Sequence, residues 1–257
     1  MKGKFNIGSS QYSVDFSEKY DISIPLVFNG LQPNTYGVNI ASSRAYEDEQ
    51  FIGDTRRGGP CNFETYTLTP HCNGTHTECI GHITKDRINI LSSLKEEIIP
   101  ATLISISPKL KKNDLVITRE EILSKLENVS QDFLKALIIR TLPNNENKKS
   151  KNYLQEASSF FSVGAMECLV DIGVNHLLVD TPSVDRLLDD GELSTHNIFW
   201  ETRNKEFNAE AQHKTITEMI FVDNTIQDGK YLLNLQIPAF VSDAAPSRPI
   251  LYMINEL

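Results

Sequence analysis

The stretch LKALIIRT, residues 134–141, has the short apolar run that is typical of a buried strand. Two further strands are predicted on either side of it, at 101–106 (ATLISI) and at 176–180 (HLLVD). Helices are predicted between these strands: one begins at the capping box Thr118-Arg-Glu-Glu121, and one covers 156–172. This alternation of strands and helices favours an α/β (α+β) fold with a mixed sheet and flanking helices.

The rest of the chain is less regular. Strands are predicted at 21–27 (DISIPLV), 63–69 (FETYTLT) and 114–117 (DLVI). Residues 29–60 show no clear period, and so long a loop inside a compact domain is usually functional or contains short elements. No repeat and no linker divides the sequence, so we expect a single domain over residues 1–257.

The composition narrows the classes of function. The formal net charge of −9 repels phosphate backbones, so nucleic acid is not an expected partner. No signal peptide is recognisable, and no apolar run reaches the roughly 20 residues that cross a bilayer. Four cysteines in 257 residues do not form a disulfide scaffold. We therefore expect a cytoplasmic protein with reduced thiols and no membrane partner.

The segment HCNGTHTECIGH, residues 71–82, contains three of the six histidines. On a helix, Glu78 would lie about 200° from His76, because each residue turns by roughly 100°. On an extended chain every second side chain shares a face. Cys72, His76, Glu78 and His82 would then point to one side, whereas His71 would point to the other.

One thiol, two imidazoles and one carboxylate on one face can bind zinc or a similar divalent ion. Histidine and cysteine also occur in protein cores and on surfaces without any ligand role, but four such residues on one face favour a metal or catalytic site. Structural zinc sites are usually closed and rich in sulfur. This set is rich in histidine and carboxylate, which indicates an open site.

These residues resemble a known family. Gly74-Thr75-His76-x-Glu78-x-x-x-His82 resembles the GTHxDxxxH core of the cyclase family, which includes kynurenine formamidase (arylformamidase) and isatin hydrolase. Further segments resemble that family in the same order: 21–26, 137–141, 173–185, His196, Glu218 and 245–251. The likeness covers most of the chain.

The resemblance implies a swivelling β/β/α fold with one or two divalent ions, of which zinc is the first expectation and manganese the second. It places the metal site at an oligomer interface and so implies a homodimer or homotetramer. His76 and Glu78 would be metal ligands, and His196 and Glu218 would bind the same ion or a second one, or orient the water. His82 would be the general acid or base, because histidine exchanges protons near neutral pH.

Two positions depart from the family pattern. The first ligand of the family is a histidine, four residues before the second, but Cys72 stands there and the histidine is at His71. Cysteine can replace histidine as a zinc ligand, and a local bulge could instead turn His71 inward. The aspartate of the family is replaced by Glu78, which is one methylene longer.

Three hypotheses follow for the function. The first is a metal-dependent amidohydrolase of arylformamidase type, in which metal-activated water attacks the amide or formamide of a small aromatic substrate. The second is a member of the family that binds a small molecule and has lost catalysis. The third is a thiol enzyme with Cys72 as the nucleophile.

Overall fold

The computed structural model describes all residues 1–257 and contains fifteen strands and five α-helices. The strands are β1 (Lys2–Ile7), β2 (Ser10–Asp21), β3 (Ser42–Ala45), β4 (Glu64–Thr67), β5 (His76–Cys79), β6 (Ile98–Ile106), β7 (Lys109–Lys111), β8 (Asp114–Ile117), β9 (Ala136–Thr141), β10 (Phe160–Phe161), β11 (His176–Val179), β12 (Thr215–Glu218), β13 (Gly229–Asn234), β14 (Ala244–Pro246) and β15 (Ile250–Glu256). The α-helices are α1 (Pro70–Asn73), α2 (Ile90–Ser93), α3 (Arg119–Leu126), α4 (Val163–Asp171) and α5 (Ser194–Phe199). Five 3-10 helices complete the list: η1 (Thr55–Arg57), η2 (Ile80–His82), η3 (Gln131–Phe133), η4 (Glu146–Ser150) and η5 (Ala209–Ala211).

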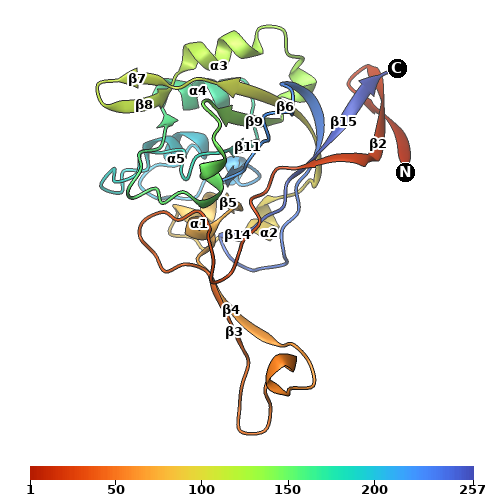
Figure 1. Cartoon of the computed structure of the whole chain (residues 1–257). Helices are drawn as coiled ribbons and strands as arrows, with labels where there is room; N and C mark the ends of the chain where they lie inside the picture. The colour runs from red at the N-terminus through yellow and green to blue at the C-terminus, as the bar shows by residue number, and fades with distance from the viewer.

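One ten-stranded mixed sheet organises the molecule (Figure 1). Its order is β1-β2-β15-β13-β6-β9-β11-β12-β5-β14. The four neighbours β6, β9, β11 and β12 are parallel, and all other pairs in the sheet are antiparallel. The parallel strands therefore form the centre, and β5 with β14 forms one antiparallel edge.

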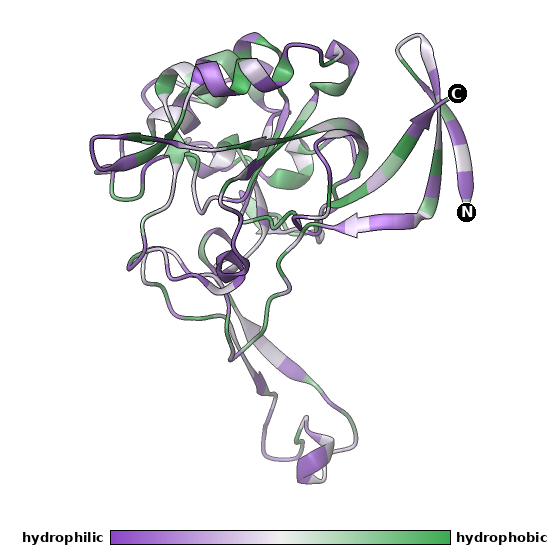
Figure 2. Ribbon diagram, turned by 45° about the horizontal axis from the view of Figure 1, so that its top comes forward, coloured by the Kyte–Doolittle hydropathy of each residue, from purple (hydrophilic) through white to green (hydrophobic).

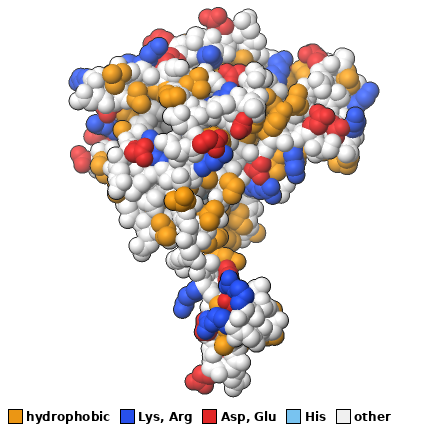
Figure 3. Space-filling view, viewed as in Figure 1, with side chains coloured by type: hydrophobic (Ala, Val, Ile, Leu, Met, Phe, Trp, Pro, Cys, Tyr) orange, Lys and Arg blue, Asp and Glu red, His pale blue; other side chains and the backbone are white.

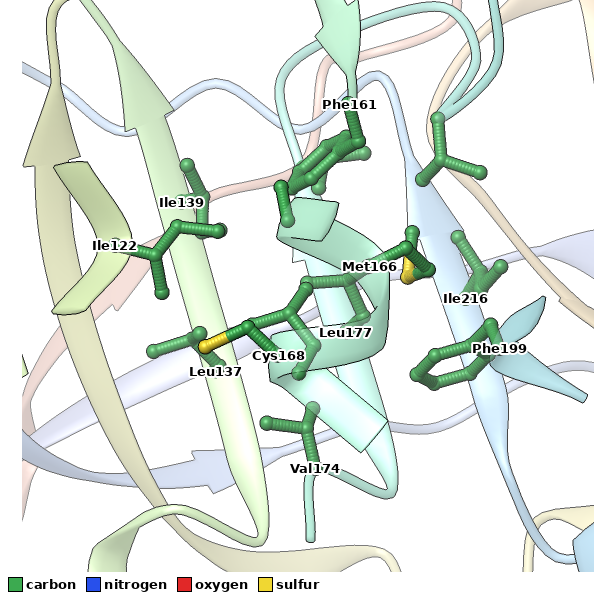
Figure 4. Packing of buried hydrophobic residues seen from close by; sticks show 14 of the residues in the cluster. Ile122, Leu137, Ile139, Phe161, Met166, Cys168, Val174, Leu177, Phe199 and Ile216 are labelled. Carbon is green, nitrogen blue, oxygen red and sulfur yellow. The ribbon is translucent and has the colours of Figure 1, made fainter. Parts of the chain in front are cut away.

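The central strands are buried on both faces. In β9, Leu137 and Ile139 belong to the cluster that α3, α4 and α5 cover, whereas Ala136 and Ile138 belong to a second cluster on the other face. Figure 4 shows Leu137 and Ile139 on their strand beside the α4 side chains. Parallel strands that are covered on both faces have continuous apolar sequences. This burial explains why 134–141 lacks an alternating pattern.

A two-stranded hairpin, β3 with β4, projects away from the body (Figure 1). Its ribbon is mostly white to purple in Figure 2, in contrast to the green central strands. Tyr46, Phe51 and Phe63 form a small aromatic cluster beyond the strands, with ring centroids 5.2 Å apart for Tyr46 and Phe63. The stretch 29–60, which has no sequence period, thus contains β3 and η1.

The expected mixed α/β fold class is confirmed, and most central elements lie where they were predicted. The predictions at 63–69, 101–106, 114–117, 134–141 and 176–180 correspond to β4, β6, β8, β9 and β11. The capping box at Thr118 and Glu121 is present at the start of α3.

Two predictions were wrong in extent. The strand predicted at 21–27 is irregular after Asp21. Ile22 still donates to the Pro249 carbonyl, next in the register of β2 with β15, but Pro249 has no N–H to donate in return, and Phe221 donates to the Ile22 carbonyl instead. The helix predicted at 156–172 begins only at Val163. Ser162 caps that helix by accepting a hydrogen bond from the Ala165 N–H, and the residues before it pair with β8 as β10.

No helix of the structure combines the length and the hydropathy that a membrane span requires.

The burial of leucines in the core predicts how much two leucine-to-alanine variants lose in unfolding free energy. Leu177→Ala should lower the free energy of unfolding by about 2–5 kcal/mol, because Leu177 is fully buried between the sheet and the helices. Leu123→Ala on α3 should lower it by less than about 1 kcal/mol, because that side chain is 40% exposed. Urea unfolding of both variants measures the difference, and equal losses would contradict this description of the core.

Candidate metal centre

The chain changes direction twice between residues 70 and 82, and these turns form the site. Pro70 begins the single turn of α1, where its missing N–H is tolerated. β5 then runs from His76 to Cys79, and η2 ends at His82. Gly81 is required in η2, since an added Cβ would lie 2.0 Å from the Ile88 carbonyl oxygen.

The extended backbone expected over 72–82 is therefore wrong at both ends. Only β5 is extended, and there His76 and Glu78 share a face as expected. In α1 successive residues are turned by about 100°, so the rule of alternate side chains does not apply. As a result, His71 belongs to the cluster of side chains whose possible ligand atoms converge, and Cys72 does not. The members of this cluster are His71, His76, Glu78, His82, His196 and Asp243.

Neighbouring elements bring in the distant residues. β5 lies between β12 and β14, and His76 is opposite Glu218 in the register with β12. His196 comes from α5, and Asp243 lies directly before β14. Residues that are up to 172 positions apart thus meet around β5.

Glu78 is the centre of this cluster. Its Oε2 lies 2.9 Å from His71 Nδ1 and 3.7 Å from His82 Nε2. Its Oε1 lies 3.1 Å from His196 Nε2. Two groups of possible ligands share this carboxylate: His71 with His76, and His82 with His196. Glu78 is therefore placed to bind one ion or to bridge two.

Glu218 lies beside His76 and His196 of the same cluster. Its Oε2 is 3.6 Å from His76 Nε2, and its Oε1 is 3.8 Å from His196 Nε2. The Val184 N–H also donates to Oε1 at 2.9 Å. Burial, together with repulsion by Glu78, raises the pKa of Glu218 well above its usual range. A bound cation would favour its ionised form.

Each of three histidines has an acceptor behind one ring nitrogen. His196 Nδ1 lies 2.6 Å from Asp185 Oδ2, His76 Nδ1 lies 2.9 Å from the Gly74 carbonyl, and His71 Nε2 lies 2.8 Å from Asp243 Oδ2. The other nitrogen of each ring faces the glutamates. Such an acceptor fixes the tautomer of a metal-binding histidine.

Two of the buried polar atoms that form no well-aligned hydrogen bond belong to the cluster: His76 Nε2 and Glu78 Oε2, the second of which has His71 Nδ1 at 2.9 Å. Burial and the neighbouring His71 lower the pKa of His76 to about 4, so its ring is neutral and offers a lone pair. Burial opposes ionisation of Glu78, but the surrounding histidines outweigh burial and hold its pKa well below its usual range. A neutral imidazole and an ionised carboxylate fit a divalent cation.

The balance of charge in the site also favours a bound cation. Only histidines form ion pairs with the four carboxylates of the site, Glu78, Glu218, Asp185 and Asp243. Neither lysine nor arginine neutralises them. Burial opposes the charged form of His71, but the carboxylates of Asp243 and Glu78, one beside each ring nitrogen, raise its pKa to about 10. Without an ion, protonated histidine thus supplies the positive charge that the carboxylates require.

The site reaches solvent through three of its side chains. The side chains of His71, His82 and Asp243 are each about one quarter exposed, at 25%, 27% and 25%. His76, Glu78, His196 and Glu218 are buried. A substrate can therefore approach past His82, while the inner residues are shielded from bulk water.

Cys72 is buried beside the cluster, and its thiol is not activated. Burial and the nearby Glu218 raise its pKa to about 11. Reactive cysteines have a lowered pKa, because the thiolate is the nucleophile. These surroundings therefore disfavour Cys72 as the nucleophile of a thiol enzyme.

Asp243 was not predicted from the sequence. It stands one residue before Ala244, at the start of the strand that pairs with β5, but a lone aspartate in a loop carries no periodic signal. Asp185 was recognised only as part of the family-like segment 173–185. Its two oxygens accept from the Thr195 and His196 main chain, which orients α5.

Comparisons with known proteins agree with this description. The cyclase family model matches residues 15–186, a span that includes His71–His82 and ends before His196, Glu218 and Asp243. A search of the curated proteins found no match.

Several solved structures have a similar fold. A predicted metal-dependent hydrolase from Bacillus stearothermophilus is 15% identical with a TM-score of 0.64, over 91% of this chain and 98% of that one. Isatin hydrolase A from Ralstonia solanacearum is 12% identical with a TM-score of 0.64, over 91% of each chain. An isatin hydrolase bound to the product analogue thioisatinate is 13% identical with a TM-score of 0.61, over 93% of this chain and 94% of that one. At these identities the likeness establishes the fold alone.

The geometry predicts which of two adjacent residues is needed for metal binding. His71→Ala should weaken the binding of zinc or manganese by about 10–100-fold or more, because it removes a nitrogen from the group around Glu78. Cys72→Ser should leave the affinity close to that of the unchanged protein. Isothermal titration of metal-free protein measures both. Loss of affinity in Cys72→Ser alone would contradict the placement of His71.

Proposed function

Because the chain belongs to the cyclase family, we propose that it is a metal-dependent hydrolase that cleaves an amide or formamide bond of a small aromatic molecule. One observation carries the proposal. Buried His76 Nε2 has no hydrogen-bond partner and converges with Glu78, whose carboxylate is contacted by histidine nitrogens, among carboxylates that no lysine or arginine neutralises.

The proposed ligands are the inward-facing atoms of the cluster. His71, His76 and Glu78 would hold one ion, and His196 with Glu218 would hold the same ion or a second one. When bound, a divalent ion acidifies water and polarises a carbonyl oxygen. We propose zinc as the first candidate, since nitrogen and carboxylate ligands suit it, and manganese as the second.

His82 is the proposed general acid or base. It lies at the open side of the cluster, where it can reach both a substrate and solvent. Its Nε2 is 3.7 Å from Glu78 and its Nδ1 is 3.6 Å from Asp243, so two carboxylates orient the ring without burying it. A side chain in this position can carry a proton between attacking water and the leaving amine.

The proposed substrate class rests on the family of this chain and on solved structures with a similar fold. Isatin hydrolases are among the similar structures, and isatin is an aromatic molecule with a cyclic amide bond. We propose an arylformamidase-type activity, with N-formylkynurenine as the first compound to test and a role in tryptophan catabolism as its consequence. The cytoplasmic location stays a prediction of the sequence.

The alternative of a binding protein without catalysis is motivated by Cys72 and Glu78, the two departures from the family pattern. Glu78 occupies the centre of the cluster despite its extra methylene, which supports retained metal binding. The two hypotheses differ in turnover, which only an assay decides.

We also propose that the chain forms a homodimer or homotetramer. A lone two-stranded hairpin is only marginally stable in water, and β3–β4 projects with few neighbours of its own. Apolar side chains gather where the hairpin joins the body (Figure 3). Leu31 and Val241 are 81% and 83% exposed, and Val241 lies two residues before Asp243. A second copy that covers Val241 would lie close to Asp243 and so to the exposed part of the site.

The hydrolase proposal predicts metal-dependent turnover. Chelation should abolish hydrolysis of N-formyl anilines, N-formylkynurenine or isatin, and zinc or manganese should restore it. His82→Ala should lower kcat by about 10²–10⁴-fold and still bind the ion at Glu78, because His82 carries the proton. Full activity of metal-free protein would contradict the proposal. Ligand-induced stabilisation without any turnover would favour the binding protein instead.

The oligomer proposal predicts a change of mass. Leu31→Asp combined with Val241→Asp should shift the protein towards the monomer in size-exclusion chromatography with light scattering, because charges would replace an apolar contact. Leu110→Asp, on β7 and 71% exposed, is the matched control and should leave the mass unchanged. A monomeric unchanged protein would refute the proposal.

A further inference from the structure

Asp243 lies behind His71 in the same way that Asp185 lies behind His196. Asp185 Oδ2 is 2.6 Å from His196 Nδ1, and the opposite nitrogen of that ring faces Glu78 Oε1 at 3.1 Å. Asp243 Oδ2 is 2.8 Å from His71 Nε2, and the opposite nitrogen of that ring faces Glu78 Oε2 at 2.9 Å. Two carboxylate–histidine pairs thus point at the two oxygens of one glutamate.

The ring of His71 has little freedom in this position. It stacks on the ring of His82 with centroids 4.2 Å apart and an angle of 28° between the planes. Both rings lie between the same two carboxylates, Glu78 and Asp243. The ring of His76 closes the other side at 5.3 Å, edge to face. The orientation of His71 is therefore set by two neighbouring rings and two carboxylates, of which Asp243 is the outer one.

A neutral imidazole carries one proton and offers one lone pair. If Nε2 carries the proton and donates it to Asp243, Nδ1 keeps the lone pair and faces the cluster. The opposite tautomer would turn an N–H towards the place of the cation and prevent coordination. The carboxylates of Asp243 and Glu78 both accept hydrogen bonds only, and they lie 2.8 and 2.9 Å from the two ring nitrogens. Once a cation occupies Glu78, Asp243 is the acceptor that is left, and it favours the first tautomer.

We infer that Asp243 is a positioning residue that fixes the tautomer and the orientation of His71. His71 can then act as a metal ligand, a role that the family pattern gives to the residue at position 72. The inference rests on the metal binding in the proposed function and specifies how this chain achieves it. Asp243 then compensates for Cys72, whose side chain does not join the converging ligand atoms.

Asp243 could instead bind the ion directly, because its carboxylate also converges with His71 and His82. The two roles predict different couplings. A positioning residue acts through His71, so its effect disappears when His71 is absent. A direct ligand keeps its effect in that background.

A double-mutant cycle of metal affinity tests the inference. Zinc affinity is measured by isothermal titration with a competing chelator, on metal-free full-length protein without substrate. Asp243→Asn should weaken binding by about 10–100-fold, because an amide can donate to the ring and stabilise the wrong tautomer. His71→Ala should weaken it by at least as much, and the double variant should bind no more weakly than His71→Ala. Asp86→Asn, an exposed aspartate in the loop after η2, is the matched control and should be unchanged.

Asp243→Glu tests whether a loss in Asp243→Asn comes from misfolding. It keeps a carboxylate at this partly exposed position and should recover part of the metal affinity. Unchanged affinity in Asp243→Asn would overturn the inference, and so would additive losses in the double variant. Absence of zinc or manganese binding in the unchanged protein would overturn the proposed function as well. Metal binding with the expected coupling but without hydrolysis would sustain the inference and refute only the hydrolase.

Discussion

Two buried carboxylates that no lysine or arginine neutralises dominate this structure. Glu78 and Glu218 are 1% and 4% exposed, and they face each other across His76 and His196. Burial of like charges is unfavourable unless positive charge lies between them. Protonated histidine can supply that charge, and a divalent cation supplies more of it with better geometry. The arrangement of β5, β12 and α5 has its simplest physical explanation in this requirement.

The fold meets this requirement with a rigid support on one side and irregular segments on the other. β5 and β12 hold His76, Glu78 and Glu218 in register at the end of a sheet whose centre is buried on both faces. The remaining groups come from short turns: α1, η2, α5 and the residue before β14. Strands fix positions accurately, and turns allow side chains to approach from several directions. Both properties are needed to surround one glutamate with three histidines.

The chain departs from its family pattern at the first ligand position, and the structure shows how the change is accommodated. One turn of helix at Pro70–Asn73 rotates His71 towards Glu78 and leaves Cys72 buried beside it. Asp243 lies on the outer side of the His71 ring. Cys72 at this position thus coincides with a histidine one residue earlier and with a carboxylate partner for that histidine. An acceptor behind a metal-binding histidine matters because a ring without one is free to adopt the wrong tautomer.

The sequence by itself determined the mixed α/β class, the central strands and the membership of His76, Glu78, His82, His196 and Glu218 in one set of motifs. It could do so because apolar runs such as 134–141 and short motifs such as 74–82 are local signals. Only the tertiary structure placed His71, and not Cys72, among the converging side chains, because one helical turn replaced the extended backbone from which their directions had been inferred. It also brought Asp243 to His71 across 172 positions of sequence. Pairing of β14 with β5 creates that contact, and no pattern within a single segment encodes which distant strand becomes a neighbour.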